Sequence, residues 1–208
     1  MLRVELDEKM LKEIEEACTN IQRNYKQLMK KSINAAGKEI QKLAIQEDSE
    51  RYAFKKKKTI KENVKEEKAT AGKLVYGIKA SNERAEIGDY HVSNRKVLKG
   101  DARPKKGISG KVLKKNGLKK LESDGMLAFV TQFQSGHVAV VVRVPGKSYS
   151  HPQERKSKGW DTTKIEKLLS PSVHRSLKNA FPYKEKEAHE ILLEEISKEI
   201  NKTLGGTQ

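Results

Sequence analysis

The chain has 208 residues, and 44 lysines and arginines outnumber 28 aspartates and glutamates, so the formal net charge is +16. With 35% hydrophobic and 5% aromatic residues, the apolar content is enough for one modest core and excludes a large buried enzyme interior. No apolar run reaches the roughly 18 residues of a membrane-spanning helix, and the start of the chain lacks the apolar stretch of a signal peptide.

The first fifty residues predict an amphipathic helix, because apolar residues recur between positions 7 and 46 at steps of three and four. It is either one helix of about forty residues or two helices that break near residues 19–24. Cys18 lies at this apolar spacing, which is typical of a small core residue. One helix face admits two interpretations, a contact between subunits or an intrachain core; it consists of Ile14, Ile21, Leu28 and Ile33.

The positive surplus begins at residue 51, since residues 1–50 are close to neutral. Two aromatic residues, Tyr52 and Phe54, precede four consecutive lysines, Lys55, Lys56, Lys57 and Lys58. Thr59 and Glu62 have the spacing of a capping box, so a short helix is predicted from Thr59 to about residue 67.

Between residues 72 and 120 the pattern changes to strands and a basic segment. Strands are predicted over 73–79 and 85–90. Residues 95–120 contain eleven bases and one acid, Asp101, with glycines interspersed, which indicates a mobile basic loop or hairpin. The bases are Arg95, Lys96, Lys99, Arg103, Lys105, Lys106, Lys111, Lys114, Lys115, Lys119 and Lys120.

The clearest strand signal covers residues 126–133 and 137–144, which flank a short glycine-containing connection suited to an antiparallel hairpin. Pro145 and Gly146 are expected to end the second strand, and a polar loop with Trp160 follows over 147–161. The residues predicted to build the sheet core are Phe129, Phe133, Val138, Val140 and Val142.

The C-terminal part predicts a short strand from residue 165 and then a helix with Pro171 in its first turn. A last helix is predicted over 184–204, with Gly205 and Gly206 as its end. The fold class expected is α+β, with helices packed on a small antiparallel sheet. The segments are residues 1–50 (helical), 51–183 (basic arm and sheet body) and 184–208 (helix), which together make one compact domain with extensions.

Chemistry is not indicated by the motifs. The five histidines are scattered singly, and no zinc, nucleotide-phosphate or nucleophile motif occurs, so we expect no enzyme, no metal and no cofactor. The basic segments allow two interpretations. They could contact nucleic-acid phosphates, with Tyr52, Phe54 and Tyr90 as stacking groups, or they could dock on an acidic protein partner.

Two blocks of the second half resemble the minor tail protein Z family of tailed phages, prophages and phage-tail-like particles. In the first, an aromatic strand that ends in glutamine (residues 128–133), the Gly136 turn and a Val-Arg strand (residues 140–143) follow a basic, glycine-rich loop. The second runs from Ile165 through Pro171-Ser172-Val173 into a helix. The weaker upstream likeness extends the resemblance to about residues 30–180, and the long loop at 147–161 departs from it.

The resemblance implies a structural virion protein without catalytic activity. Such a tail completion or terminator-like protein forms a ring, commonly six-fold, at the neck end of the tail tube. Its partners would be copies of itself and the tail tube, sheath, collar or connector proteins, with passing contact to DNA and no membrane. It would be made in the host bacterial cytoplasm. The competing interpretation is a cytosolic nucleic-acid-binding protein that uses the lysine-rich loops.

Overall fold

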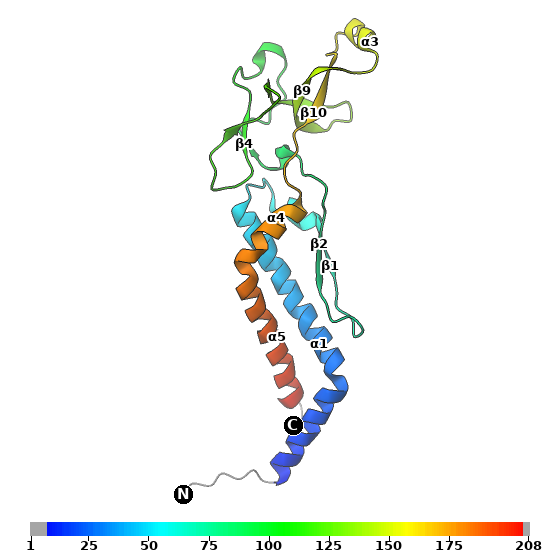
Figure 1. The fold of residues 1–208 in the computed structure, drawn as a ribbon, viewed down its shortest axis with the longest axis vertical. Coiled ribbons are helices and arrows are strands. Elements are labelled where there is room, and N and C mark those ends of the chain that lie inside the picture. The colour runs from blue at the N-terminus through cyan, green and yellow to red at the C-terminus, as the bar shows by residue number, and fades with distance from the viewer. Residues whose placement is uncertain (1–7, 206–208) are drawn as a thin grey trace. The chain divides into compact units, whose positions relative to one another are not determined.

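The computed structural model describes residues 8–205, apart from the side chains of residues 8–11, 13–15, 17, 18, 20 and 204 (Figure 1). It has the α+β fold expected, with a long N-terminal helix, small antiparallel sheets and C-terminal helices. The chain divides into two compact units. The first contains residues up to 47, residues 64–80 and residues from 179 onward, and the second contains residues 48–63 and 81–178. Residues 64–80 thus belong with the helices and not with the sheet body.

The first unit is built on one long helix, α1 (Glu8–Arg51), whose last turn lies in the second unit. The helix has no break at residues 19–24, where the sequence contains neither proline nor glycine. The other elements of this unit are β1 (Val64–Glu67), β2 (Gly77–Ala80), η3 (Phe181–Lys184) and α5 (Glu185–Gly205). Gly206, which was expected to help end α5, lies outside the described residues.

The β1–β2 hairpin corrects two expectations. Residues 64–67 form a strand where helix was predicted, and β2 begins at Gly77, not at residue 73. Reciprocal backbone hydrogen bonds between Thr70 and Lys73 close the turn, and this turn sets Glu67 opposite Gly77. The register of the hairpin is therefore decided by its turn chemistry, which hydrophobic alternation alone does not reveal.

The β1–β2 hairpin lies beside α1 within the first unit (Figure 1). Side chains hold the two together. The ring of Tyr76 lies over Gly37, and a Cβ atom at that position would come closer than 3.0 Å to three ring carbons. The Tyr76 hydroxyl lies 2.7 Å from Glu66 Oε2 and 3.0 Å from Gln41 Oε1. Asn34 donates to the carbonyl of Ala69 and accepts from its amide at 2.8 Å. The turn half of the hairpin is thus tied to the helix at two points, Ala69 and Tyr76.

The second unit contains most of the strands. Its elements are α2 (Lys57–Glu62), η1 (Ile87–Asp89), β3 (His91–Val92), η2 (Gly100–Ala102), β4 (Ser109–Lys111), β5 (Lys119–Lys120), β6 (Glu122–Ser123), β7 (Met126–Leu127), β8 (Phe129–Gln132), β9 (Val138–Ser148), α3 (Pro152–Ser157), β10 (Thr163–Lys167) and the start of α4 (Val173–Ala180).

Two helical features of this unit differ from the prediction. The capping box of Thr59 and Glu62 does not form: α2 begins at Lys57 after Lys56, which makes no side-chain cap, and it ends at Glu62. Residues 85–90 form η1 and two isolated bridges, at Glu86 and Tyr90, not a strand. Both segments are short, so long-range contacts outweigh their weak local preferences.

The main sheet has the order β10-β9-β8, with all pairs antiparallel. The predicted hairpin is present, with Phe129 opposite Val141 and Gln132 opposite Val138, and Gly136 takes the positive φ of 82° that its turn requires. The prediction that Pro145 and Gly146 end the strand is wrong, since β9 continues to Ser148 across an irregularity in its pairing with β10.

The core of the second unit lies on one face of this sheet. Val140 and Val142 belong to it, as do Val130 and the fully buried Tyr90. The core prediction is wrong for Val138, which is 44% exposed because it begins β9 at the turn end of the hairpin, opposite the exposed Gln132. Phe129 and Phe133 alternate onto the other face, where they are half-buried under cationic side chains.

The start of α4 is capped by Ser172, whose Oγ accepts from the amide of Arg175 at 3.2 Å, and Pro171 precedes the helix. Within the second unit, Ser176 of α4 donates to Oδ2 of the fully buried Asp48 at 3.2 Å. Among residues 8–205, no helix is long and apolar enough to cross a membrane.

Candidate interaction surface

The lysines of the predicted basic segment gather on the hairpin formed by β4, β5 and their connection, residues 109–120, which we call the lysine hairpin. β5 pairs with β4, so that Lys119 lies opposite Gly110. A turn closed by the Asn116 amide and the Leu113 carbonyl connects them. Lys111 is half-buried, whereas the four other lysines of the hairpin are exposed: Lys114, Lys115, Lys119 and Lys120.

These lysines have almost no acidic partners. Among the eleven bases of residues 95–120, only Lys120 forms an ion pair within the described chain, with Glu122 at 2.8 Å. The Lys111 ammonium is 3.5 Å from the carbonyl of Lys114, which is a marginal contact. The positive charge of this segment is therefore left to water and to whatever binds it.

The two arginines of the segment do not share this role, which corrects their assignment to the interaction surface. Arg95 donates to the backbone carbonyls of Gly88 and Tyr90, and it is half-buried. Arg103 donates to the carbonyl of Leu98 at 2.9 Å, and its guanidinium lies 4.1 Å from the ring centroid of Phe129. Both guanidinium groups hold the fold of the surrounding loops.

The earlier basic run, Lys55 to Lys58, is exposed and follows residues that are fixed in the core. The aromatic residues expected to stack on bases are not available to a ligand. Tyr52 and Tyr90 are buried, and the ring of Phe54 stacks on that of Tyr90 at 4.3 Å between centroids. These rings are unavailable because they pack in a small hydrophobic core. The sequence alone did not show whether they would be exposed.

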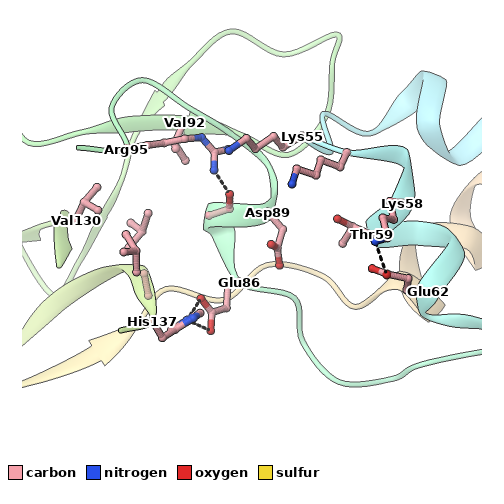
Figure 2. Close-up of a pocket in the computed structure, with 15 residues that line it drawn as sticks. Lys55, Lys58, Thr59, Glu62, Glu86, Asp89, Val92, Arg95, Val130 and His137 are labelled. Carbon is pink, nitrogen blue, oxygen red and sulfur yellow. Dashed lines mark hydrogen bonds and ion pairs between the residues drawn. The ribbon is translucent and has the colours of Figure 1, made fainter. Parts of the chain in front are cut away.

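A cavity of about 370 Å³ lies beside the same run within the second unit (Figure 2). Lysines and carboxyl groups share its polar part, and valines contribute its apolar part. The Asp89 carboxyl is partly buried and lies near the charge of Glu86, and both effects raise its pKa. The residues that define the cavity chemically are Lys55, Lys56, Lys58, Glu62, Glu86, Asp89, Arg95, His137, Val130 and Val140.

One carboxylate of this cavity is held by a histidine and a lysine from distant parts of the chain. Glu86 lies 2.9 Å from His137 Nε2 (Figure 2). It also lies 2.5 Å from Lys167 Nζ. Burial acts to raise the pKa of Glu86, but these hydrogen bonds outweigh it, so the pKa lies below its ordinary value. The three residues have no recognisable spacing in the sequence, and β9 and β10 bring them together.

The cavity lining includes no cysteine and no serine. Among the described residues there is also no group of three side chains able to hold a metal ion. The arrangement can bind charged groups, because both signs of charge are present at its rim, but it displays no nucleophile paired with His137.

A second group that the sequence did not reveal lies between β9 and β10, around α3. The guanidinium of Arg155 is 4.1 Å from the ring centroid of Tyr149 and 5.6 Å from that of Trp160, and Lys158 lies 5.2 Å from the latter. Trp160 is 45% exposed. The polar loop expected here is thus an ordered arm with an aromatic and cationic tip.

The predicted subunit-packing face of α1 is partly used within the chain. Leu28 is buried in the single chain at 8% exposure, and Ile21 and Ile33 are half-buried. Leu28 therefore supports the intrachain interpretation. The side chains of Ile14 and Cys18 lie outside the described residues.

Searches against protein-family models, the curated proteins and the solved structures find no match for this chain.

Proposed function

We propose that this chain is a structural tail completion or terminator-like protein of a phage or phage-tail-like particle. In this proposal it forms a ring, six-fold by analogy with that family, at the neck end of the tail tube and joins the tube to connector, sheath or collar proteins. The observation that carries the proposal is the block of sequence over 128–143, which resembles the minor tail protein Z family and which folds here as the β8–β9 hairpin.

Two structural features support an assembly role. The β9–β10 arm presents Trp160, Tyr149 and Arg155 at an ordered tip, and these three residue types are enriched at protein–protein contacts that dominate binding energy. The exposed run Lys55, Lys56 and Lys57 presents charge that opposite charge on a neighbouring surface would steer and satisfy.

A density label fused to the C-terminus tests this proposal. Imaging of purified tail particles should show label at one end only, distal to the baseplate, and averaging should reveal the symmetry of the ring. Label along the whole tube, or no label on any particle, would contradict the neck assignment.

The second candidate is a cytosolic nucleic-acid-binding protein, which the unpaired lysines of residues 95–120 favour. It predicts that a monomer binds nucleic acid, that binding weakens steeply with salt, and that the labelled protein is recovered away from tail particles.

A further inference from the structure

We infer that the lysine hairpin binds the phosphate backbone of duplex DNA without reading its sequence. This inference deepens the proposed function, on which its setting rests, because DNA that leaves a capsid would pass through a neck ring. The lysines that carry it are Lys114, Lys115, Lys119 and Lys120, with Lys111 behind them.

The first step concerns charge that the fold leaves unneutralised. Exposed ammonium groups that lie close together on one hairpin repel one another and hold small counterions. A polyanion that replaces these counterions releases them to solution, and the entropy gained drives binding. Residues 109–120 contain five lysines and no acid, and only Lys120 has a carboxylate partner nearby.

The second step separates a phosphate ligand from an acidic protein surface. Contacts between proteins are depleted in lysine and enriched in arginine and aromatic residues. Arginine also pairs with carboxylates through two parallel hydrogen bonds, whereas lysine acts as a point charge on a flexible stem. The lysine hairpin contains neither arginine nor an aromatic residue, and the neighbouring Arg95 and Arg103 are engaged with backbone carbonyls. This composition favours phosphates.

The third step concerns the form of the nucleic acid. Proteins that bind single strands stack bases on aromatic side chains. Tyr52, which forms a bridge with Leu113 of the hairpin, and Tyr90 are buried, and Phe54 stacks on Tyr90. Phe129, the nearest aromatic residue along the chain, is half-buried under the guanidinium of Arg103. Asn116 is the one side chain of the hairpin with the amide group used to read base edges, so sequence recognition has little support. A duplex held by its backbone is the ligand that remains.

Fluorescence anisotropy with the purified full-length protein and a short duplex of random sequence tests the inference over a series of salt concentrations. The variant K114Q/K115Q/K119Q/K120Q changes exposed side chains only. We expect the slope of log affinity against log salt to shrink by about 0.9 for each lysine that contacts a phosphate, and affinity at low salt to fall at least about tenfold.

A matched control removes the same charge elsewhere. K65Q/K68Q/K73Q/K79Q takes four exposed lysines from the β1–β2 hairpin, and we expect its affinity to stay within about twofold of the unchanged protein because three of those lysines already have carboxylate partners. Circular dichroism and gel filtration check that both variants fold as the parent does.

Three outcomes would overturn the inference. The hairpin variant could bind duplex as tightly as the parent, or the control could lose as much affinity as the hairpin variant. Polyglutamate could also displace the duplex at equal concentration of charge, which would identify a surface for acidic proteins. The label experiment is separate: loss of DNA binding leaves a neck label intact, and an absent neck label leaves measured DNA binding intact.

Discussion

Two β-hairpins of this protein are rich in lysine, but they differ in whether nearby carboxylates neutralise that charge. In the β1–β2 hairpin, Glu66 and Glu67 form ion pairs with Lys68, Lys73 and Lys79 at 2.8 to 3.3 Å. The lysine hairpin has no acid of its own. The first hairpin packs on α1 through Tyr76, whereas a Cβ added at Gly117, in the connection of the second, would meet no atom within 4 Å.

The difference shows how charge can distinguish a structural element from a binding element. The hydroxyl of Tyr76 and the ammonium of Lys68 lower the pKa of Glu66, and the ammonium groups of Lys79 and Lys73 lower that of Glu67. These carboxylates are thus ionised and neutralise the lysines beside them. The second hairpin keeps its charge available, which is why we assign the ligand to it.

The largest expected effect is on the pH dependence of stability, and it comes from the buried carboxyl of Asp48. Its Oδ1 accepts no hydrogen bond in the described structure, and burial raises the pKa to about 7 despite the hydrogen bond from Ser176. In the unfolded chain Asp48 ionises near pH 4, so between pH 4 and 7 only the folded state holds the proton. Stability therefore falls as pH rises through this window, by at most about 4 kcal/mol.

Urea unfolding at several pH values measures this effect. Asp48→Asn should flatten the dependence between pH 4 and 7, whereas Lys114→Gln, which removes an exposed unpaired charge, should leave it unchanged. A pH dependence of the Asp48→Asn variant equal to that of the parent protein would contradict the assignment of a protonated, buried Asp48.

The next effect concerns the anchoring of the β1–β2 hairpin. Gly37→Ala places a methyl group against the Tyr76 ring, and we expect the unfolding free energy to fall by about 2 kcal/mol, although alanine favours helix. Gly117→Ala is the control, because its added Cβ meets open space and stability should change little. Equal stability of the two variants in thermal unfolding would contradict the claim that the Tyr76 ring packed over Gly37 anchors the hairpin on α1.

A smaller effect is expected from the hydroxyl of the same anchor. Tyr76→Phe keeps the ring over Gly37 and removes the contacts with Glu66 and Gln41, which should cost about 1 kcal/mol in urea unfolding. The pKa of Glu66 should also rise toward its ordinary value in an NMR titration, since the Tyr76 hydrogen bond is the main cause of its lowering. No change in that pKa would mean that Lys68 alone sets it.

The smallest expected effect comes from removing the two acids of the β1–β2 hairpin and measuring its affinity for duplex DNA. Glu66→Gln with Glu67→Gln leaves the lysines of β1–β2 without carboxylates, and we expect duplex affinity to rise about two- to threefold at low salt. Stability should change little, because exposed ion pairs contribute little. If anisotropy shows no gain, pairing with acids is not what separates the two hairpins.

Strong periodic patterns were predicted well, and short mixed segments were not. The helices over α1 and α5 and the β8–β9 hairpin follow from apolar spacing and a glycine turn. The strand at residues 64–67 was mistaken for helix because a local capping pattern at Thr59 and Glu62 suggested one. Such a pattern is worth about 1 kcal/mol, and pairing with β2 outweighs it.

The sequence predicted that the candidate surface would be rich in lysine and arginine. It did not predict which of these side chains would be exposed. The count of bases in residues 95–120 located it, yet only the fold separates exposed lysines from the arginines that bind backbone carbonyls. The same holds for Val138, whose apolar character predicted burial although the turn exposes it. Which partner a side chain meets depends on residues far away in the chain.

The sequence by itself determined the net charge, the helical and strand periodicity and the concentration of lysine in one segment, because these properties depend on neighbouring residues alone. Tertiary structure decided which charges are neutralised and which carboxyl is buried. Glu86, His137 and Lys167 meet only after β9 and β10 pair, and Asp48 meets Ser176 only after α4 packs. Ion pairing and burial depend on distances in space, so they become defined only when the chain has folded.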